Sequence, residues 1–106
     1  MPASKREFVW SLPAERDLEE VWDYLAFEAS IGVAQARMDA IERHAGTLLQ
    51  HPFIGRPRDD LRPGVRGILI TPHVLFYRVH ADVIEILRVI HSSRDVETEF
   101  ARKPLE

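Results

Sequence analysis

The chain has 106 residues, of which 45% are hydrophobic and 29% are charged, and it contains no cysteine. This size and composition predict a single globular domain, residues 1–106, and exclude an intrinsically disordered or fibrous protein. The missing cysteine excludes disulfides, thiolate metal sites and a thiol nucleophile, and the formal net charge of −3 is unfavourable for coating nucleic acid by bulk electrostatics.

Charge is unevenly distributed along the chain. Residues 1–53 hold five basic against nine acidic side chains (−4), and residues 54–106 hold nine against eight (+1). Seven arginines lie between positions 56 and 94, and a guanidinium can bind a carboxylate or phosphate through two hydrogen bonds. This density indicates anion contacts, but it also fits solvated charges that pair with Asp82, Glu85 and Asp95.

The first half predicts a strand followed by two helices. Residues 6–10 are rich in β-branched and aromatic side chains, as strands are. Pro13 suits a first helical turn, and apolar residues at three- and four-residue steps predict a helix over 13–28. Ser30 is a candidate N-cap for a second helix that should end near His51. Because the connection is short, the two helices are expected to form an antiparallel hairpin.

The second half predicts a loop, three strands and a short helix. Residues 52–64 contain Pro, Gly and Asp at positions that exclude a long regular element, so a basic loop is expected there. The apolar runs 65–71, 74–80 and 83–90 are joined by connections too short for a parallel crossover, which predicts antiparallel neighbours. Asp95 is a candidate cap for a final helix to residue 102, with Phe100 as its apolar anchor.

The last strand, 83–90, is expected to be apolar on both faces. Strict alternation places one set on one face (Ile84, Ile86, Arg88, Ile90) and another set on the opposite face (Val83, Glu85, Leu87, Val89). Such a strand belongs inside a sheet, with the helical hairpin over one face. The predicted architecture is α+β, in the order β-α-α-β-β-β-(α), with a helical hairpin on a small antiparallel sheet to which the first strand also pairs.

The sequence lacks the motifs of common catalytic and cofactor sites. It contains no phosphate-binding loop, nucleophile elbow, zincin motif or dinucleotide fingerprint. Its five histidines lack the close spacing of metal ligands, so neither a metal nor another cofactor is predicted. The absence of a long apolar run and of a signal-peptide core predicts a cytoplasmic protein.

A small polar set near the predicted sheet remains: Arg66, Tyr77, Arg78, Arg88, His91 and Arg94. His91 and Arg94 are expected beside Arg88 at one end of the sheet. A base, an acid and arginines in one cluster can cleave RNA, because they can deprotonate the 2′-hydroxyl, protonate the leaving oxygen and stabilise the charge that develops. The same residues can equally bind an acidic protein surface, or be structural residues at the edge of the core.

Three segments together resemble the ParE-like toxins of the ParE/RelE superfamily of toxin–antitoxin modules: DLEEVWDYL, LLQHPFIGRPRDDLRPGVRGILI and VLFYRVHADVIEILRVIHSSRD. The resemblance extends from about Phe8 to Asp95. It implies the superfamily's fold and a bacterial type II toxin, held inactive by an antitoxin whose C-terminal segment wraps the toxin and whose N-terminal part is often a ribbon-helix-helix DNA binder. An acidic or amphipathic tail fits a surface that bears arginines and is partly apolar, including the second face of the sheet.

The superfamily divides by target, since RelE-like members cleave mRNA on the ribosome and ParE-like members are associated with poisoning DNA gyrase. Three features favour the ParE side: arginines without lysine in the 52–64 loop, a C-terminal HSSRDVETEF without the tyrosines of several nucleases, and a net charge unfavourable in an RNA-lined site. The resemblance thus implies a gyrase-binding toxin with a ParD-like antitoxin, no assigned catalytic residue, no membrane contact and nucleic acid met only indirectly. The candidate target contacts are Arg66, Tyr77, Arg88, His91 and Arg94.

Two alternatives stay open. A ribosome-dependent endoribonuclease of RelE type would use His91 or Tyr77 in proton transfer, with Arg66 and Arg88 stabilising charge. A family member that has lost toxicity would serve as an interaction or plasmid-stabilisation partner. In each case apolar surface that an antitoxin covers is expected to make the isolated chain poorly soluble or dimeric.

Overall fold

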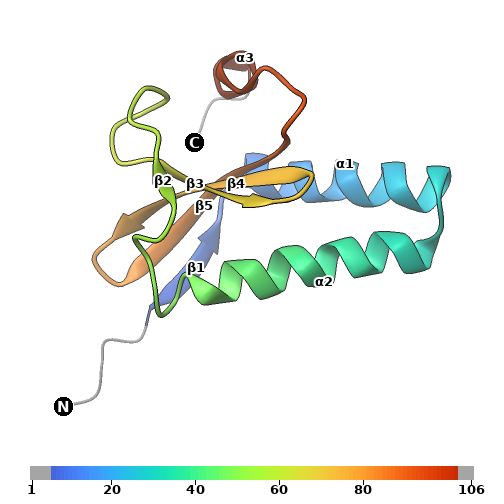
Figure 1. The fold of residues 1–106 in the computed structure, drawn as a ribbon, viewed down its shortest axis with the longest axis horizontal. Helices are drawn as coiled ribbons and strands as arrows, with labels where there is room; N and C mark the ends of the chain where they lie inside the picture. Colours follow the sequence, from blue (N-terminus) through green and yellow to red (C-terminus); the bar gives the residue numbers. More distant parts are fainter. Residues whose placement is uncertain (1–5, 103–106) are drawn as a thin grey trace.

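A computed structural model describes residues 6–102, and its elements follow the predicted order (Figure 1). The N-terminal half contains β1 (Glu7–Trp10), α1 (Leu12–Glu28) and α2 (Ile31–Thr47). The C-terminal half contains β2 (Arg56–Pro57), β3 (Arg66–Ile70), β4 (His73–His80), β5 (Val83–His91) and α3 (Val96–Arg102). The two-residue β2 lies within the segment for which a basic loop was predicted.

Serine side chains cap both long helices. The Ala14 N–H donates to Ser11 Oγ over 3.1 Å, and the Val33 N–H donates to Ser30 Oγ over 3.1 Å, as predicted for Ser30. α2 ends at Thr47 rather than near His51. The predicted end was wrong because Leu48 and Leu49 continue the apolar spacing, whereas the backbone there has tightened into turns with bonds to the third residue back.

The five strands lie in the order β1-β5-β4-β3-β2. β3, β4 and β5 form the predicted antiparallel meander, and β5 is an interior strand, as expected. β1 pairs with β5 in parallel, with Phe8 opposite Ile84, so the sheet is mixed. The sequence predicted that the first strand joins the sheet but did not predict its direction. A parallel pair needs a long connection, and here the helical hairpin, β3 and β4 all lie between the two strands.

A β-bulge interrupts β5 and reassigns its faces. Tyr77 pairs with Ile86 and Phe76 pairs with Arg88, so Leu87 is an extra residue without a partner of its own. After the bulge the alternation is displaced by one position. Val89 therefore packs in the core under the hairpin, while Ile90 packs on the opposite face. The strict alternation predicted for this strand was wrong beyond Leu87, which lies on the face opposite Ile86 as expected.

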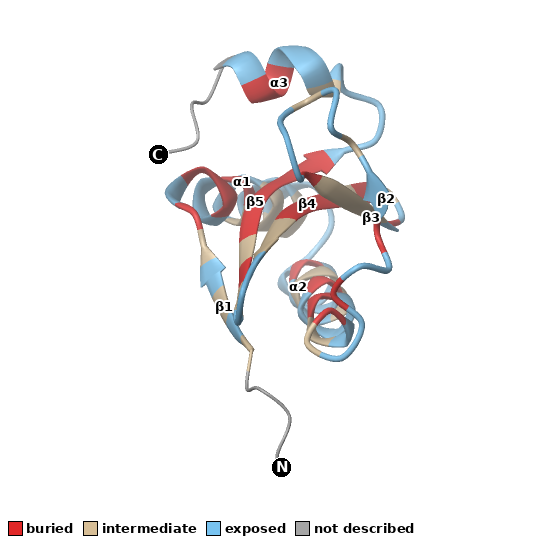
Figure 2. Ribbon diagram, turned by 90° about the vertical axis from the view of Figure 1, so that its left-hand side faces the viewer, coloured by how far each residue is buried: buried red, intermediate tan, exposed pale blue. Residues whose placement is uncertain are grey.

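The sheet has a core on each face, as Figure 2 shows for the buried strands between α3 on one side and α2 on the other. On the far face from the hairpin, the Phe100 ring of α3 lies 5.2 Å from the Phe76 ring, edge to face. Asp95 caps α3, because its Oδ1 accepts the Thr98 backbone N–H over 3.3 Å. Its Oδ2 also accepts from Thr98 Oγ1 over 2.9 Å, and these bonds lower the pKa of Asp95. The predicted cap and anchor are confirmed, and the second apolar face is covered by α3 rather than left for a partner.

The helical hairpin extends beyond the edge of the sheet (Figure 1), and the molecule measures 47 × 31 × 22 Å. Three apolar residues at its outer end, Tyr24, Phe27 and Ile31, are 65%, 86% and 68% exposed. We call these three residues the hairpin tip. Within residues 6–102, no helix combines the length and the apolar character that crossing a membrane requires.

Candidate functional site

A cavity of about 450 Å³ opens where the hairpin meets the ends of β4 and β5. We call it the sheet-end cavity. Three of the five predicted site residues line it: Arg88, His91 and Arg94. The prediction that these three meet at one end of the sheet is confirmed, because His91 is the last residue of β5 and Arg94 follows in the turn toward α3.

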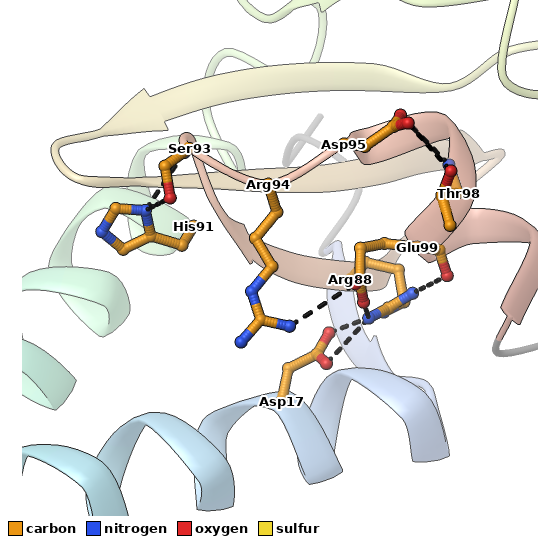
Figure 3. Close-up of polar contacts among 8 residues, drawn as sticks. All are labelled: Asp17, Arg88, His91, Ser93, Arg94, Asp95, Thr98 and Glu99. Atoms are coloured by element: carbon orange, nitrogen blue, oxygen red, sulfur yellow. Dashed lines mark hydrogen bonds and ion pairs between the residues drawn. The ribbon is translucent and has the colours of Figure 1, made fainter.

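Arg88 forms the floor of the sheet-end cavity and is 1% exposed. Its Nε and Nη2 donate to the two carboxylate oxygens of Asp17 over 2.7 and 3.0 Å, and its Nη1 donates to the Glu99 carbonyl over 2.6 Å (Figure 3). The Val89 N–H also donates to Asp17, over 2.9 Å. This network joins α1, β5 and α3, and so Arg88 presents almost no surface to a partner.

His91 and Arg94 form the exposed rim of the cavity. His91 Nδ1 accepts the Ser93 N–H over 3.1 Å, so in the neutral ring the proton lies on Nε2 (Figure 3). The Arg94 side chain is 59% exposed, and its Nη1 lies 3.4 Å from Glu99 Oε2. The rim therefore exposes the edge of the His91 ring and the Arg94 guanidinium. The carboxylate of Glu99, which lies beside Arg94, is also 3.5 Å from buried Arg88.

His73 is a cavity residue that the sequence analysis missed. It begins β4 directly opposite His91, and the two rings meet edge to face with centroids 5.3 Å apart. His73 is 7% exposed, and its buried Nδ1 has no hydrogen-bond partner within the described chain. Burial, followed by the proximity of His91 and Arg37, lowers the pKa of His73 to about 4, so the ring is neutral at pH 7.

The sequence indicates only weakly that His73 lies near His91, and it does not give the strand register that sets them directly opposite each other. A two-residue turn at Ala81–Asp82 pairs His80 with Val83, and counting back from it places His73 opposite Ile90. The extra residue of the bulge moves the partner to His91.

Arg66 and Tyr77 lie elsewhere, opposite each other on β3 and β4 and roughly 13 Å of strand from His73. Arg66 Nη1 donates to the carbonyls of Phe53 and Gly55 over 3.1 and 2.8 Å, and its guanidinium lies 5.2 Å from the Phe53 ring centre. Tyr77 is fully buried, and its hydroxyl accepts the Gly55 N–H over 2.9 Å. Burial raises the pKa of Tyr77. This pair clamps the segment 53–55.

The candidate residues therefore form two groups rather than one. The endoribonuclease alternative places His91 or Tyr77 together with Arg66 and Arg88, but Tyr77 and Arg66 do not line the cavity that contains the other two. Glu85 pairs with Arg78 over 3.3 Å, which confirms for this arginine the alternative that it is a surface charge paired with a nearby acid. Asp95 serves instead as the helix cap. Among residues 6–102 no group of three or more His, Asp or Glu side chains could hold a metal ion.

Comparison with known proteins decides the family. Residues 8–96 match the family described as the ParE toxin of type II toxin–antitoxin systems, parDE. The chain belongs to the ParE toxin family. Toxin ParE1 of Caulobacter vibrioides is 42% identical over 82 residues, which cover 76% of this chain and 82% of that protein. Toxin ParE1 of Mycobacterium tuberculosis is 32% identical over 91 residues, covering 85% and 93%.

The ParE fold is also seen in a solved structure. A chain of the chromosomal ParDE TA system from P. aeruginosa superimposes with a TM-score of 0.72 at 24% identity, covering 84% of this chain and 98% of the other. The resemblance drawn from the three sequence segments is thus confirmed, and the chain is a toxin of a type II toxin–antitoxin module. In this ParE-family member the sheet-end cavity is bounded by both helices of the hairpin, β4, β5 and α3.

Proposed function

We propose that this ParE-family toxin inhibits DNA gyrase by binding it, and that a ParD-like antitoxin neutralises it in the cytoplasm. The observation that carries the proposal is the separation of Tyr77 and Arg66 from Arg88 and His91, because the four residues named for the endoribonuclease alternative do not form one cluster. A toxin that acts by binding needs an exposed surface rather than such a cluster. The match to the ParE family over residues 8–96 supports the same assignment.

The five predicted target-binding residues differ in exposure, and this difference separates residues that can contact a target from residues that position other groups. His91 and Arg94 stand at the rim, where a partner can reach them. Arg88 supports them from the floor, and Arg66 and Tyr77 hold the segment 53–55. We therefore propose His91 and Arg94 as direct target contacts and the other three as positioning residues. Nucleic acid is met only through gyrase or the antitoxin.

The test is a gyrase supercoiling and DNA-cleavage assay with the purified toxin, with and without its co-expressed antitoxin. We expect loss of supercoiling with accumulation of linear DNA, and reversal by the antitoxin. Arg94→Glu should weaken inhibition by at least about tenfold, because charge complementarity at an interface is reversed. Arg62→Glu is the matched control, since Arg62 is exposed in the loop before β3 and does not line the cavity.

Other outcomes would reassign the protein. No effect at large excess over gyrase contradicts the gyrase proposal, and an assay with ribosomes and mRNA then tests for a RelE-type endoribonuclease. Harmless expression without the antitoxin, together with inactivity in both assays, indicates a member that has lost toxicity. Circular dichroism of each variant separates lost binding from lost folding.

A further inference from the structure

Two large apolar side chains stand next to each other on the surface shortly after α2. Phe53 is 61% exposed and Ile54 is 63% exposed. We call these two residues the loop pair. The segment between α2 and β2 that holds them lies at the end of the molecule opposite the outer end of the hairpin (Figure 1). Single exposed apolar residues are common on protein surfaces, whereas neighbouring ones indicate a contact with another protein.

The backbone around the loop pair is held by the sheet through three hydrogen bonds. Arg66 Nη1 donates to the carbonyls of Phe53 and Gly55, and the Tyr77 hydroxyl accepts the Gly55 N–H. Gly55 and Tyr77 are buried, so the segment is fixed from the inside while both apolar side chains remain outside. Groups that are fixed before binding lose less conformational entropy when a partner binds. The loop pair is therefore pre-organised as an anchor.

Positive charge surrounds the loop pair. The Arg66 guanidinium lies 5.2 Å from the Phe53 ring centre. The Arg56 side chain is exposed, and it forms no hydrogen bond or ion pair with the part of the chain that the structure describes. The two acids of the following loop already accept hydrogen bonds, one from the Arg58 guanidinium and one from a backbone N–H. The surface is thus apolar and cationic, and it fits an acidic partner.

Charge distinguishes the loop pair from the exposed apolar residues of the hairpin tip. Glu20 and Glu28 lie four residues on either side of Tyr24, where helical geometry makes them its neighbours. An acidic partner is repelled there and attracted to the loop pair. The proposed target contacts, His91 and Arg94, are both polar, whereas a tight interface also has a desolvated apolar centre. The loop pair supplies the apolar anchor that those two residues lack.

We propose that the loop pair anchors the toxin on an acidic surface of its protein target, with Arg56 contacting acidic side chains and with Arg66 and Tyr77 positioning the pair. The inference rests on the proposed function, because it assigns a second contact with gyrase. A folded target cannot adapt its course as a wrapping antitoxin segment does. It therefore gains most from an anchor that is already fixed.

The first test compares full-length toxin variants in the gyrase supercoiling assay. Phe53→Ser and Ile54→Ser should each raise the toxin concentration for half-inhibition by at least about tenfold, because the interface loses an anchor. Leu69→Ser is the matched control and should stay within about twofold. Leu69 is also 63% exposed, but it pairs with Val74 on the face of the sheet that α3 covers. Unfolding midpoints of all variants check that the fold is retained.

The affinity for the antitoxin encoded with the toxin, measured by surface plasmon resonance, separates the two partners. Each loop-pair variant should bind the antitoxin within about threefold of the unchanged toxin. If the variants inhibit gyrase as strongly as the unchanged toxin, the inference is wrong and the proposed function stands. If the loss appears in antitoxin affinity alone, the loop pair is an antitoxin contact and the inference is again wrong. If the unchanged toxin does not inhibit gyrase at large excess, the proposed function is contradicted and the inference falls with it.

Tyr77→Phe tests positioning separately from contact. Tyr77 is fully buried, and the variant removes only the hydroxyl that accepts the Gly55 N–H. Hydrogen exchange at the Gly55 amide should become faster, and inhibition of gyrase should weaken about threefold or more because the loop pair is less fixed. Faster exchange with unchanged inhibition would contradict the part assigned to rigidity.

Charge reversal tests the acidic character of the partner surface. Arg56→Glu should weaken toxin binding to immobilised gyrase by at least about tenfold at about 0.05 M salt and by less at about 0.5 M, because salt screens exposed charges. Arg62→Glu, at an exposed position of the following loop, should stay within about twofold at both salt concentrations. Equal binding by Arg56→Glu and Arg62→Glu would contradict an acidic partner surface at the loop pair.

Discussion

Asp17 and Arg88 form a buried ion pair between residues 71 positions apart. Both are almost fully buried, and Asp17 also accepts the Val89 N–H, so one carboxylate satisfies three donors from two residues of β5. Removing one partner of a buried pair leaves an uncompensated charge. Asp17→Ala should therefore destabilise the fold by about 3–5 kcal/mol, measured by urea unfolding. Asp23→Ala, at an exposed position of the same helix, should change stability by less than about 0.5 kcal/mol.

His73 makes the stability of the isolated chain depend on pH. Its pKa is lowered from 6.5 to about 4 in the fold, so on acidification the unfolded chain takes up a proton before the folded chain does. Stability from this residue is complete above pH 6.5 and falls as pH drops toward 4, by about 1.4 kcal/mol per unit. Urea unfolding at pH 7 and pH 5 should differ by about 2 kcal/mol. In His73→Leu the change in unfolding free energy between pH 7 and pH 5 should be smaller by about 2 kcal/mol. An unchanged pH dependence in this variant would disprove the assignment.

At the scale of the element, the segment 53–55 is held by side chains of the sheet. A Cβ added at Gly55 would lie 2.6 Å from the Tyr77 hydroxyl and 3.1 Å from the Gly67 carbonyl. Gly55→Ala should therefore displace the segment 53–55 from Tyr77 and Arg66 and destabilise the chain by about 1–3 kcal/mol. Gly46→Ala is the matched control, because nothing lies within 4 Å of the added atom in α2. It should stabilise the helix by up to about 1 kcal/mol, so thermal unfolding of the two variants should shift in opposite directions.

At the scale of the whole molecule, the projecting hairpin sets the solution behaviour. Its outer turns pack on each other without a sheet beneath them, and the hairpin tip remains exposed. Exposed apolar patches promote self-association. Phe27→Lys, at a position 86% exposed, should reduce concentration-dependent association in sedimentation velocity, while stability changes by less than about 0.5 kcal/mol. Equal association of the variant would place the self-associating surface elsewhere.

Local spacing was sufficient to predict most of the elements and one half of the candidate site. Apolar periodicity identified both long helices, the caps Ser30 and Asp95 marked helix starts, and the short connections required an antiparallel meander. Arg88, His91 and Arg94 were expected together because they are close in sequence at one strand end. Each of these features depends on residues only a few positions apart, where backbone geometry alone sets the neighbours.

Contacts between distant segments decided the rest. The bulge at Leu87 exchanged the faces of Val89 and Ile90 and set His73 opposite His91, and it arises from strand pairing that no single strand encodes. Arg88 is a core residue because Asp17 of α1 and Glu99 of α3 lie against its guanidinium. Arg66 and Tyr77 form hydrogen bonds to the loop segment 53–55 rather than facing the cavity. Sequence spacing by itself therefore determined the order and type of the elements, and only the tertiary structure determined which polar side chains face a partner, because burial depends on what the remainder of the chain places over them.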